Sequence, residues 1–217
     1  SQGHEIGSHT VNHPYLTDLS ESELRYELSE SQSVINLNIP SRLCVSFAYP
    51  GNLTNSLVEA ITSEYYVAAR AGWVGEGGGH FNLYEDLDPS TPVPAGLTFG
   101  SLKAVDFYNV AGDNAPFDVP VSTLDAKLDA AMAFNAWYCP YLHVVPNDSY
   151  YIDYLATFLD HILARNIWMA PFGEVAQYMR ERLASTITII SSDASAILLN
   201  LANSLNGSIY STPLTIR

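Results

Sequence analysis

Short apolar segments alternate with stretches of helical length along most of this 217-residue chain. Strands that alternate with helices of ten or more residues build βαβ units, so the order predicts an α/β fold with a parallel sheet. Ser20 and Glu23 have the spacing of a capping box, and the helix that they start should end at Pro40. Further helices are expected at residues 54–63, 122–134, 147–165 and 173–183, and strands at 4–10, 43–49, 65–71, 137–145 and 167–170.

Two regions depart from this alternation. Residues 72–100 are rich in Gly and Pro and are expected to form a long loop, which in a compact domain is usually functional. After residue 185 the pattern is that of short β-strands, expected at 186–191, 197–201 and 209–216, with an Asn206-Gly207 turn between the last two. We therefore expect a main domain at 1–183 and a small β appendage at 184–217.

The charge balance restricts the partners. Asp and Glu number 23 against 9 Lys and Arg, for a formal net charge of −14. An acidic surface repels phosphate backbones, so nucleic acid is excluded as an expected partner and a neutral carbohydrate is favoured. No apolar run is long enough to predict a membrane-spanning helix. Three sequons, at Asn52, Asn147 and Asn206, agree with a secreted or periplasmic protein. Cys44 and Cys139 either pair or remain buried thiols.

His9 and His13 are the clearest candidates for chemistry. Two imidazoles four residues apart can face one centre, and Zn²⁺ favours such nitrogens. Taken alone, the spacing also fits two surface histidines near a turn.

The surroundings of this pair are more specific. The segment Gly3-His4-Glu5-Ile6-Gly7-Ser8-His9-Thr10-Val11-Asn12-His13-Pro14 resembles the second motif of the polysaccharide deacetylase (NodB-like) family. The resemblance implies that His9 and His13 bind a catalytic metal, with zinc preferred. It further implies that Thr10 shapes the loop behind the ligands and that His4 is structural.

The segment Ser46-Phe47-Ala48-Tyr49-Pro50-Gly51 is similar to the third motif of the same family. The resemblance implies a wall of the active-site groove, with Tyr49 and Pro50 against the substrate and the Gly51 N–H donating to the oxyanion. Some members have an arginine where this chain has Ala48, so that function is lost here or supplied elsewhere. Seen alone, the peptide also fits a buried strand that ends in a Pro-Gly turn.

Tyr141-Leu142-His143-Val144-Val145 resembles the fifth motif, which implies that His143 is the general acid for the leaving group. The alternative is a core histidine bonded to backbone. Ala170 to Ala176 resembles the strand and helix that close the catalytic domain in many bacterial members. The resemblance covers residues 1 to about 183. It implies a deformed (β/α) barrel, truncated here and followed by the β appendage.

One family motif is absent. A Thr-Phe-Asp-Asp segment, which supplies the general base and the third metal ligand, should precede Gly3, together with the first strands of the barrel. The chain is then a fragment, or a second chain completes the site in a homo-oligomer, or another carboxylate has replaced the missing ones. The candidates for the last case are Glu5, Asp18, Asp86, Asp88 and Asp106.

The resulting interpretation is a metal-dependent hydrolase that removes acetyl groups from carbohydrate. Two alternatives stay open. A serine esterase is possible, although no GxSxG elbow occurs. A non-catalytic carbohydrate-binding remnant would use aromatic rings for stacking. The candidate rings are Tyr15, Tyr49, Trp73, Phe81 and Tyr84.

Overall fold

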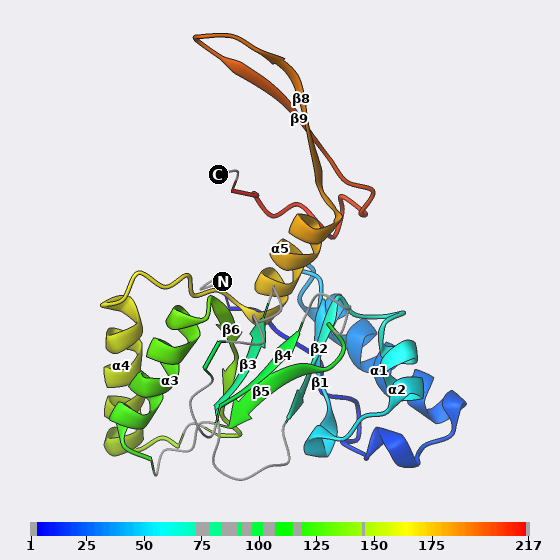
Figure 1. Ribbon diagram of the computed structural model, residues 1–217. Helices are drawn as coiled ribbons and strands as arrows, with labels where there is room; N and C mark the ends of the chain where they lie inside the picture. The colour runs from blue at the N-terminus through cyan, green and yellow to red at the C-terminus, as the bar shows by residue number, and fades with distance from the viewer. Residues whose placement is uncertain are drawn as a thin grey trace. The chain divides into compact units, whose positions relative to one another are not determined.

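The computed structural model describes residues 4–72, 79–83, 91–92, 97–101, 107–114, 119–144 and 146–215 (Figure 1). Contacts divide the chain into two compact units, Ser1–Met169 and Ala170–Arg217. The second unit therefore contains the last helix as well as the predicted appendage. The boundary predicted at residue 183 from the sequence stays a prediction.

A curled parallel sheet organises the first unit. Its strand order is β1 (Ser46–Ala48), β2 (Ala68–Gly72), β5 (Val110–Asn114) and β7 (Pro140–Tyr141). Every neighbouring pair in this sheet is parallel. The predicted α/β class is confirmed, and the curled half-barrel sheet is consistent with the predicted truncated, deformed (β/α) barrel. Each observed strand is shorter than its apolar run. The strand predicted at residues 4–10 reduces to one parallel bridge between Ser8 and Phe47, at the outer side of β1.

Two helices cover this end of the sheet. The helix α1 (Glu21–Asn38) begins at the predicted capping box of Ser20 and Glu23 and ends before Pro40. The helix α2 (Ser56–Thr62) is capped by the Asn55 side chain, which accepts from two backbone N–H groups. Both helices bury apolar side chains against β1 and β2. This core contains Leu16, Leu24, Leu28, Cys44, Phe47, Tyr49, Val58, Ile61, Tyr66, Ala69 and Ala71.

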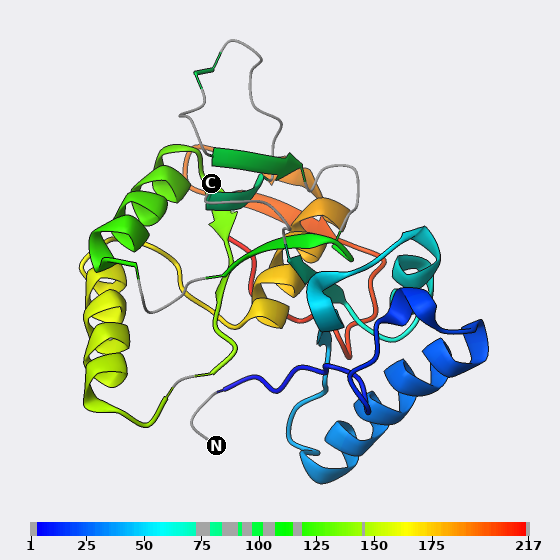
Figure 2. The same ribbon diagram turned by 90° about the horizontal axis from the view of Figure 1, so that it is seen from below.

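A second helix pair lies at the other end of the sheets, as Figures 1 and 2 show. The helix α4 (Ser149–Leu163) starts at Asp148, whose side chain accepts from the Tyr150 N–H. The helix α3 (Val121–Ala133) begins after Pro120, one residue before the predicted Ser122. The two helices share a core of Leu124, Leu128, Phe158 and Ile162.

The prediction of a loop at residues 72–100 was wrong in part, because this segment contributes two strands to a second sheet. These are β3 (Gly79–Leu83) and β4 (Leu97–Ser101), and β3 also pairs antiparallel with β6 (Ala136–Tyr138). Asn82 ties this sheet to the first one, because its side chain exchanges hydrogen bonds with the N–H and C=O of Ala111. Both cysteines are free and buried, which confirms the thiol alternative.

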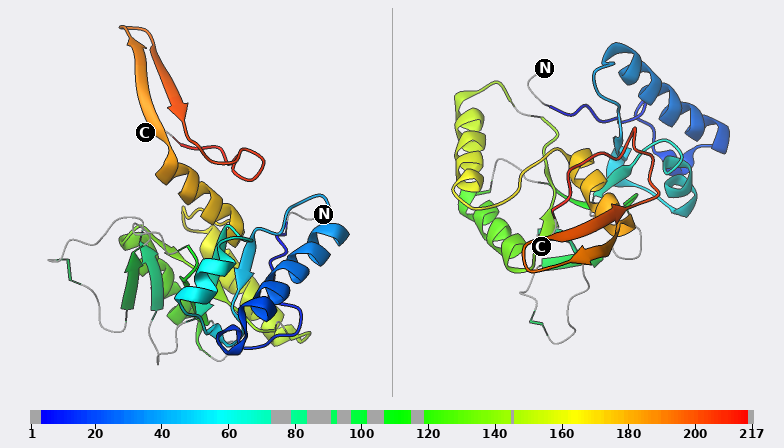
Figure 3. Two further views of the ribbon diagram at one scale, coloured as in Figure 1. Left: turned by 90° about the vertical axis from the view of Figure 1, so that its right-hand side faces the viewer. Right: turned by 90° about the horizontal axis from the view of Figure 1, so that it is seen from above.

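The second unit consists of α5 (Phe172–Ala184) and an antiparallel ribbon of β8 (Thr186–Ser192) and β9 (Ile197–Ala202) (Figure 3). The strand predicted at 209–216 does not form within the described residues. The Ile209 carbonyl instead accepts from Gln177 Nε2 of α5 at 2.5 Å, and Asn206 closes a turn with Ile209 and Tyr210. Residues 167–170 likewise form no strand.

Candidate active site

Backbone hydrogen bonds attach the loop that carries His9 and His13 to the edge of β1. The Ser8 N–H donates to the Ser46 carbonyl at 2.9 Å, and the Ala48 N–H donates to the Ser8 carbonyl at 3.0 Å. Thr10 and His13 then adopt positive φ angles of 69° and 59°, a conformation that most residues avoid. The turn brings the rings of His9 and His13 together in an edge-to-face arrangement with 4.7 Å between centroids. The two predicted metal ligands are therefore adjacent.

The His9 ring has a defined tautomer. Its Nδ1 lies 2.7 Å from the Ala48 carbonyl oxygen, which can only accept a hydrogen bond. Nδ1 therefore carries the proton, and Nε2 presents a lone pair. Desolvation lowers the pKa of His9; the hydrogen bond to Ala48 opposes this shift, while the neighbouring charges of His13, Arg70 and His143 add to it. The ring is kept neutral, which is the form that binds metals.

Glu27 of α1 holds the loop from behind, and the sequence analysis did not identify it. One carboxylate oxygen accepts from the backbone N–H groups of Val11 and Asn12 at 2.8 and 2.9 Å, and the other accepts from Asn12 Nδ2 at 2.7 Å. Burial raises the pKa of this carboxyl group, but the hydrogen bonds from Asn12 and Val11 outweigh burial, so the pKa lies below its ordinary value. The sequence feature that could have identified Glu27 is an acidic residue on the apolar face of the helix, beside Leu24 and Leu28, which are both buried.

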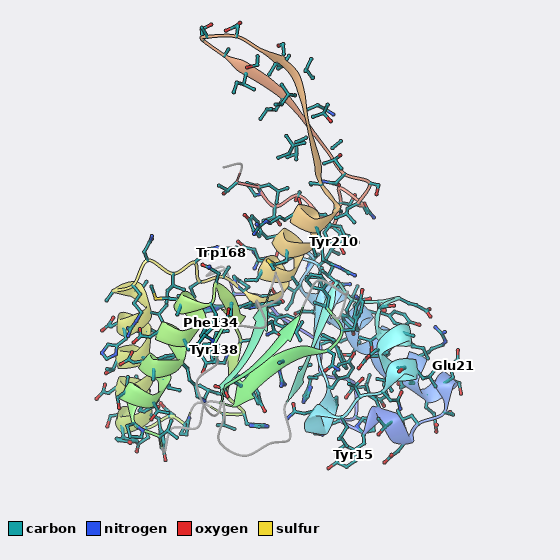
Figure 4. All side chains as sticks on the ribbon, in the orientation of Figure 1. Tyr15, Glu21, Phe134, Tyr138, Trp168 and Tyr210 are labelled. Atoms are coloured by element: carbon teal, nitrogen blue, oxygen red, sulfur yellow. The ribbon has the colours of Figure 1, made fainter. Side chains whose placement is uncertain are left out.

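Gly51 occupies a tight turn after β1. The turn is the 3₁₀ helix η2 (Pro50–Asn52), in which Gly51 has φ 63°. A Cβ at this position would lie 2.3 Å from the ring of Tyr15, a residue labelled in Figure 4. Only glycine fits a positive φ with a ring this close. The geometry agrees with a fixed backbone donor, and the oxyanion role of Gly51 stays a prediction.

Tyr49 and Pro50 are both buried, and Tyr49 donates its hydroxyl to the Tyr108 carbonyl at 2.9 Å. A buried ring cannot stack on a sugar, so substrate contact at these positions, still a prediction, would have to involve the backbone. Of the other aromatic candidates, Tyr15 is 52% exposed. Trp73 and Tyr84 and the side chain of Phe81 lie outside the described residues.

His143 follows β7 rather than lying within a strand as predicted from the sequence. It is exposed, and its ring centroid lies 5.6 Å from that of Tyr141. A chain of contacts connects it to His9: Arg70 lies over the Tyr141 ring and is the register partner of Ala48, whose carbonyl accepts from His9. The structure thus brings His9, His13 and His143 to one region, and the role of His143 as general acid stays a prediction.

Two of the five predicted carboxylate candidates, Glu5 and Asp18, lie within the described residues. Glu5 accepts a hydrogen bond from the Ser46 hydroxyl. Asp18 closes η1 (Leu16–Asp18), with the Thr17 hydroxyl 3.4 Å away. Asp86, Asp88 and Asp106 lie outside the described residues. Within the described ranges no group of three His, Cys, Asp or Glu side chains could hold a metal ion, so the site there consists of two histidines.

Arg70 of β2 is the other site residue that sequence reasoning missed. Its Nη1 donates to Asn52 Oδ1 at 2.9 Å, and its guanidinium carbon lies 4.0 Å from the centroid of the Tyr141 ring. Asn52 Nδ2 in turn contacts the Tyr141 hydroxyl at 3.1 Å. The sequence feature that could have identified Arg70 is a cationic residue within the apolar run of β2. Burial is the main cause that lowers the pKa of Arg70.

The fold and the paired histidines define a deformed-barrel α/β domain with a candidate metal centre. Residues 1–69 match the family described as "Polysaccharide deacetylase", which confirms the resemblance over that segment. The chain is also 28% identical over 233 aligned residues to a protein from a Bacillus species named "Gellan lyase". That alignment covers 100% of this chain and 9% of the relative, so the chain spans about one-tenth of the relative's length. Among the described residues, no helix is both long and apolar enough to cross a membrane.

Proposed function

We propose that this chain hydrolyses acetyl groups on carbohydrate and that it does so with a divalent metal, zinc preferred, at His9 and His13. The family match over residues 1–69 supports carbohydrate deacetylation at the level of the family. The single observation that carries the metal proposal is the hydrogen bond from His9 Nδ1 to the Ala48 carbonyl. It leaves Nε2 unprotonated on a ring whose centroid lies 4.7 Å from that of His13, and a metal ligand needs such an unprotonated nitrogen.

The chemistry divides among a few groups. A metal bound at this pair supplies a Lewis acid for the acetyl carbonyl and lowers the pKa of water. The Gly51 N–H donates a hydrogen bond to the oxygen on which negative charge develops. His143 passes a proton to the departing sugar oxygen or nitrogen. The carboxylate that takes the proton from water stays unassigned: the candidates are Glu5, Asp18, the acids outside the described residues, and a carboxylate of a second chain in the predicted homo-oligomer.

The test pairs metal analysis with product release. The purified protein is assayed for zinc per chain and for acetate released from acetylated xylan and from chitooligosaccharide. The variant His9→Ala/His13→Ala is the comparison, and His4→Ala is the matched control, since His4 lies outside the pair. We expect the double variant to lose both zinc and acetate release while His4→Ala keeps both. Full activity of the double variant would overturn the proposal.

A second candidate function is carbohydrate binding without turnover. It is favoured by the absence of a three-ligand group within the described ranges. Binding of a chitooligosaccharide or xylo-oligosaccharide with no acetate release at any zinc concentration would select this candidate. Insensitivity of any acetate release to a serine-directed inhibitor would exclude the serine esterase. A secreted or periplasmic location stays a prediction.

A further inference from the structure

The Arg70 side chain is held on two sides. Asn52 Oδ1 accepts from one guanidinium nitrogen at 2.9 Å, and the guanidinium carbon lies over the ring of Tyr141, 4.0 Å from its centroid. Asn52 and Tyr141 contact each other at 3.1 Å, so the three side chains form one cluster. Such support fixes the direction of a long cation that would otherwise have many rotamers.

Two glycines leave room for this cluster. Gly72 and Gly112 are register partners on β2 and β5. A Cβ on Gly72 would lie 2.0 Å from Asn52 Cγ, and a Cβ on Gly112 would lie 2.7 Å from Arg70 Cδ. Any other residue at either position would displace the cluster. The sheet is therefore built to accommodate Arg70 here.

The cluster adjoins the three histidines. Ala48 and Arg70 are register partners on β1 and β2, and the carbonyl of Ala48 is the acceptor for His9 Nδ1. The ring of Tyr141 also contacts that of His143 in an edge-to-face arrangement.

The guanidinium lacks a counter-charge among the described residues. It is half-buried, and the ion pairs within the described ranges join other cations to carboxylates. A partly desolvated cation without an anion is costly, and its cost is relieved when a carboxylate binds. Guanidinium matches a carboxylate with two parallel hydrogen bonds.

We propose that Arg70, supported by Asn52 and Tyr141, binds a carboxylate-bearing ligand beside the histidine pair. Two sources share this chemistry: a uronic-acid unit of the carbohydrate substrate, and the acetate that deacetylation releases. The choice of these ligands rests on the proposed function, but the binding itself requires neither metal nor turnover.

The test is an NMR titration of the metal-free protein at constant ionic strength. The shifts of the Arg70 Nε–H and of the Gly72 and Gly112 backbone N–H groups report binding. The ligands are acetate, methyl glucuronide and, as the neutral control, methyl glucoside. We expect saturable shifts with a carboxylate and none with the glucoside. Tighter binding of glucuronide identifies a substrate subsite, and tighter binding of acetate identifies a product site.

Two variants make the test specific. Arg70→Gln should weaken carboxylate binding at least tenfold. Asn52→Asp is isosteric and gives Arg70 an internal carboxylate, so it should also weaken binding at least tenfold while the unfolding midpoint stays near that of the wild type. Unchanged affinity in both variants, or no carboxylate binding by the wild type, would overturn the proposal. Carboxylate binding without acetate release would retain it and reject the proposed function alone.

Discussion

Glu27 and Asn12 are joined by two hydrogen bonds, one from the backbone N–H and one from the side-chain amide of Asn12, at 2.9 and 2.7 Å. Glu27 lies on α1, whereas Asn12 lies in the loop between the two candidate metal ligands. Glu27 is 6% exposed. The shape of the loop that carries the two candidate metal ligands thus depends on one buried acid of a neighbouring helix.

The variant Glu27→Gln tests this dependence. The amide keeps one acceptor oxygen and places an N–H₂ group against a backbone donor. We expect a loss of about 1–3 kcal/mol in the free energy of unfolding at pH 7, measured by urea denaturation. Glu30→Gln, an exposed change on the same helix, should cost less than about 0.5 kcal/mol. Equal stability of the two variants would contradict the role of Glu27.

The pH dependence of this effect has a definite sign. The pKa of Glu27 is lowered in the folded protein from an ordinary value of 4.5, so the unfolded chain binds more protons as the solution is acidified. The stabilisation is present above pH 4.5 and is lost as the pH falls through the lower folded pKa. The difference between wild type and Glu27→Gln should therefore shrink in acid. A constant difference from pH 7 to pH 3 would be inconsistent with an ionised Glu27.

Gly51→Ala should destabilise the turn after β1. The new Cβ collides with the ring of Tyr15, and alanine must adopt the backbone φ of 63°. We expect the free energy of unfolding, measured by thermal or urea denaturation, to fall by about 1–3 kcal/mol. Adding Tyr15→Ala should recover part of the loss, because it removes the collision and leaves the backbone strain. Gly207→Ala is the control, since no atom lies within 4 Å of its Cβ position. A wild-type midpoint for Gly51→Ala would argue against a rigid turn.

His9 should exist as the Nδ1-protonated tautomer. Long-range ¹H–¹⁵N correlation spectra of the metal-free protein at pH 7.5 are expected to show Nε2 without a proton. Since the pKa of His9 is lowered from 6.5, its titration midpoint should lie below 6.5. In that window the unfolded chain binds more protons than the folded one, so stability falls as the pH decreases below 6.5. A protonated Nε2 at pH 7.5 would remove the basis for metal binding.

A buried network on β5 should be more sensitive than a surface pair. Asp113 accepts from Lys127 Nζ at 2.7 Å and from the Tyr138 hydroxyl at 2.6 Å; Tyr138 is labelled in Figure 4. Burial, with the charge of Asp113, raises the pKa of Tyr138. Asp113→Asn leaves Lys127 without a counter-charge and should cost about 3–5 kcal/mol in chemical denaturation.

The matched control for this network is Asp129→Asn. Asp129 pairs with Arg165, but its side chain is 65% exposed, and an exposed pair contributes about 0–1 kcal/mol. Comparable losses for Asp113→Asn and Asp129→Asn would show that the buried network contributes no more than a surface ion pair.

Local signals predicted the helices well. The predicted capping box of Ser20 and Glu23 starts a helix in the structure, and the helix predicted at 147–165 begins after its cap, Asp148, because a cap depends on residues within one turn. The strands β3 and β4 were not predicted because their partners are distant: Asn82 bonds to Ala111 and Trp137 across many residues. The Gly and Pro content around them is typical of loops and hid the pairing.

The candidate site was predicted where a contiguous motif carries it. His9 and His13 lie in one short segment, and their rings meet as expected. Glu27 and Arg70 contribute through contacts between separate elements, so no local pattern defines their roles. Each was visible only as a charged residue at a position where the helix or strand is otherwise apolar.

The acceptor for the His9 ring is a main-chain oxygen of Ala48, and this has an evolutionary consequence. A carbonyl is present whatever side chain occupies position 48, so substitutions there can accumulate without altering the tautomer of His9. The pairing register of β1 is constrained, because a shift by one residue would point the side chains and carbonyls of the strand to the opposite side. The identity of residue 48 can therefore diverge among homologues, whereas an insertion or deletion between residues 8 and 48 that shifts this pairing would be selected against.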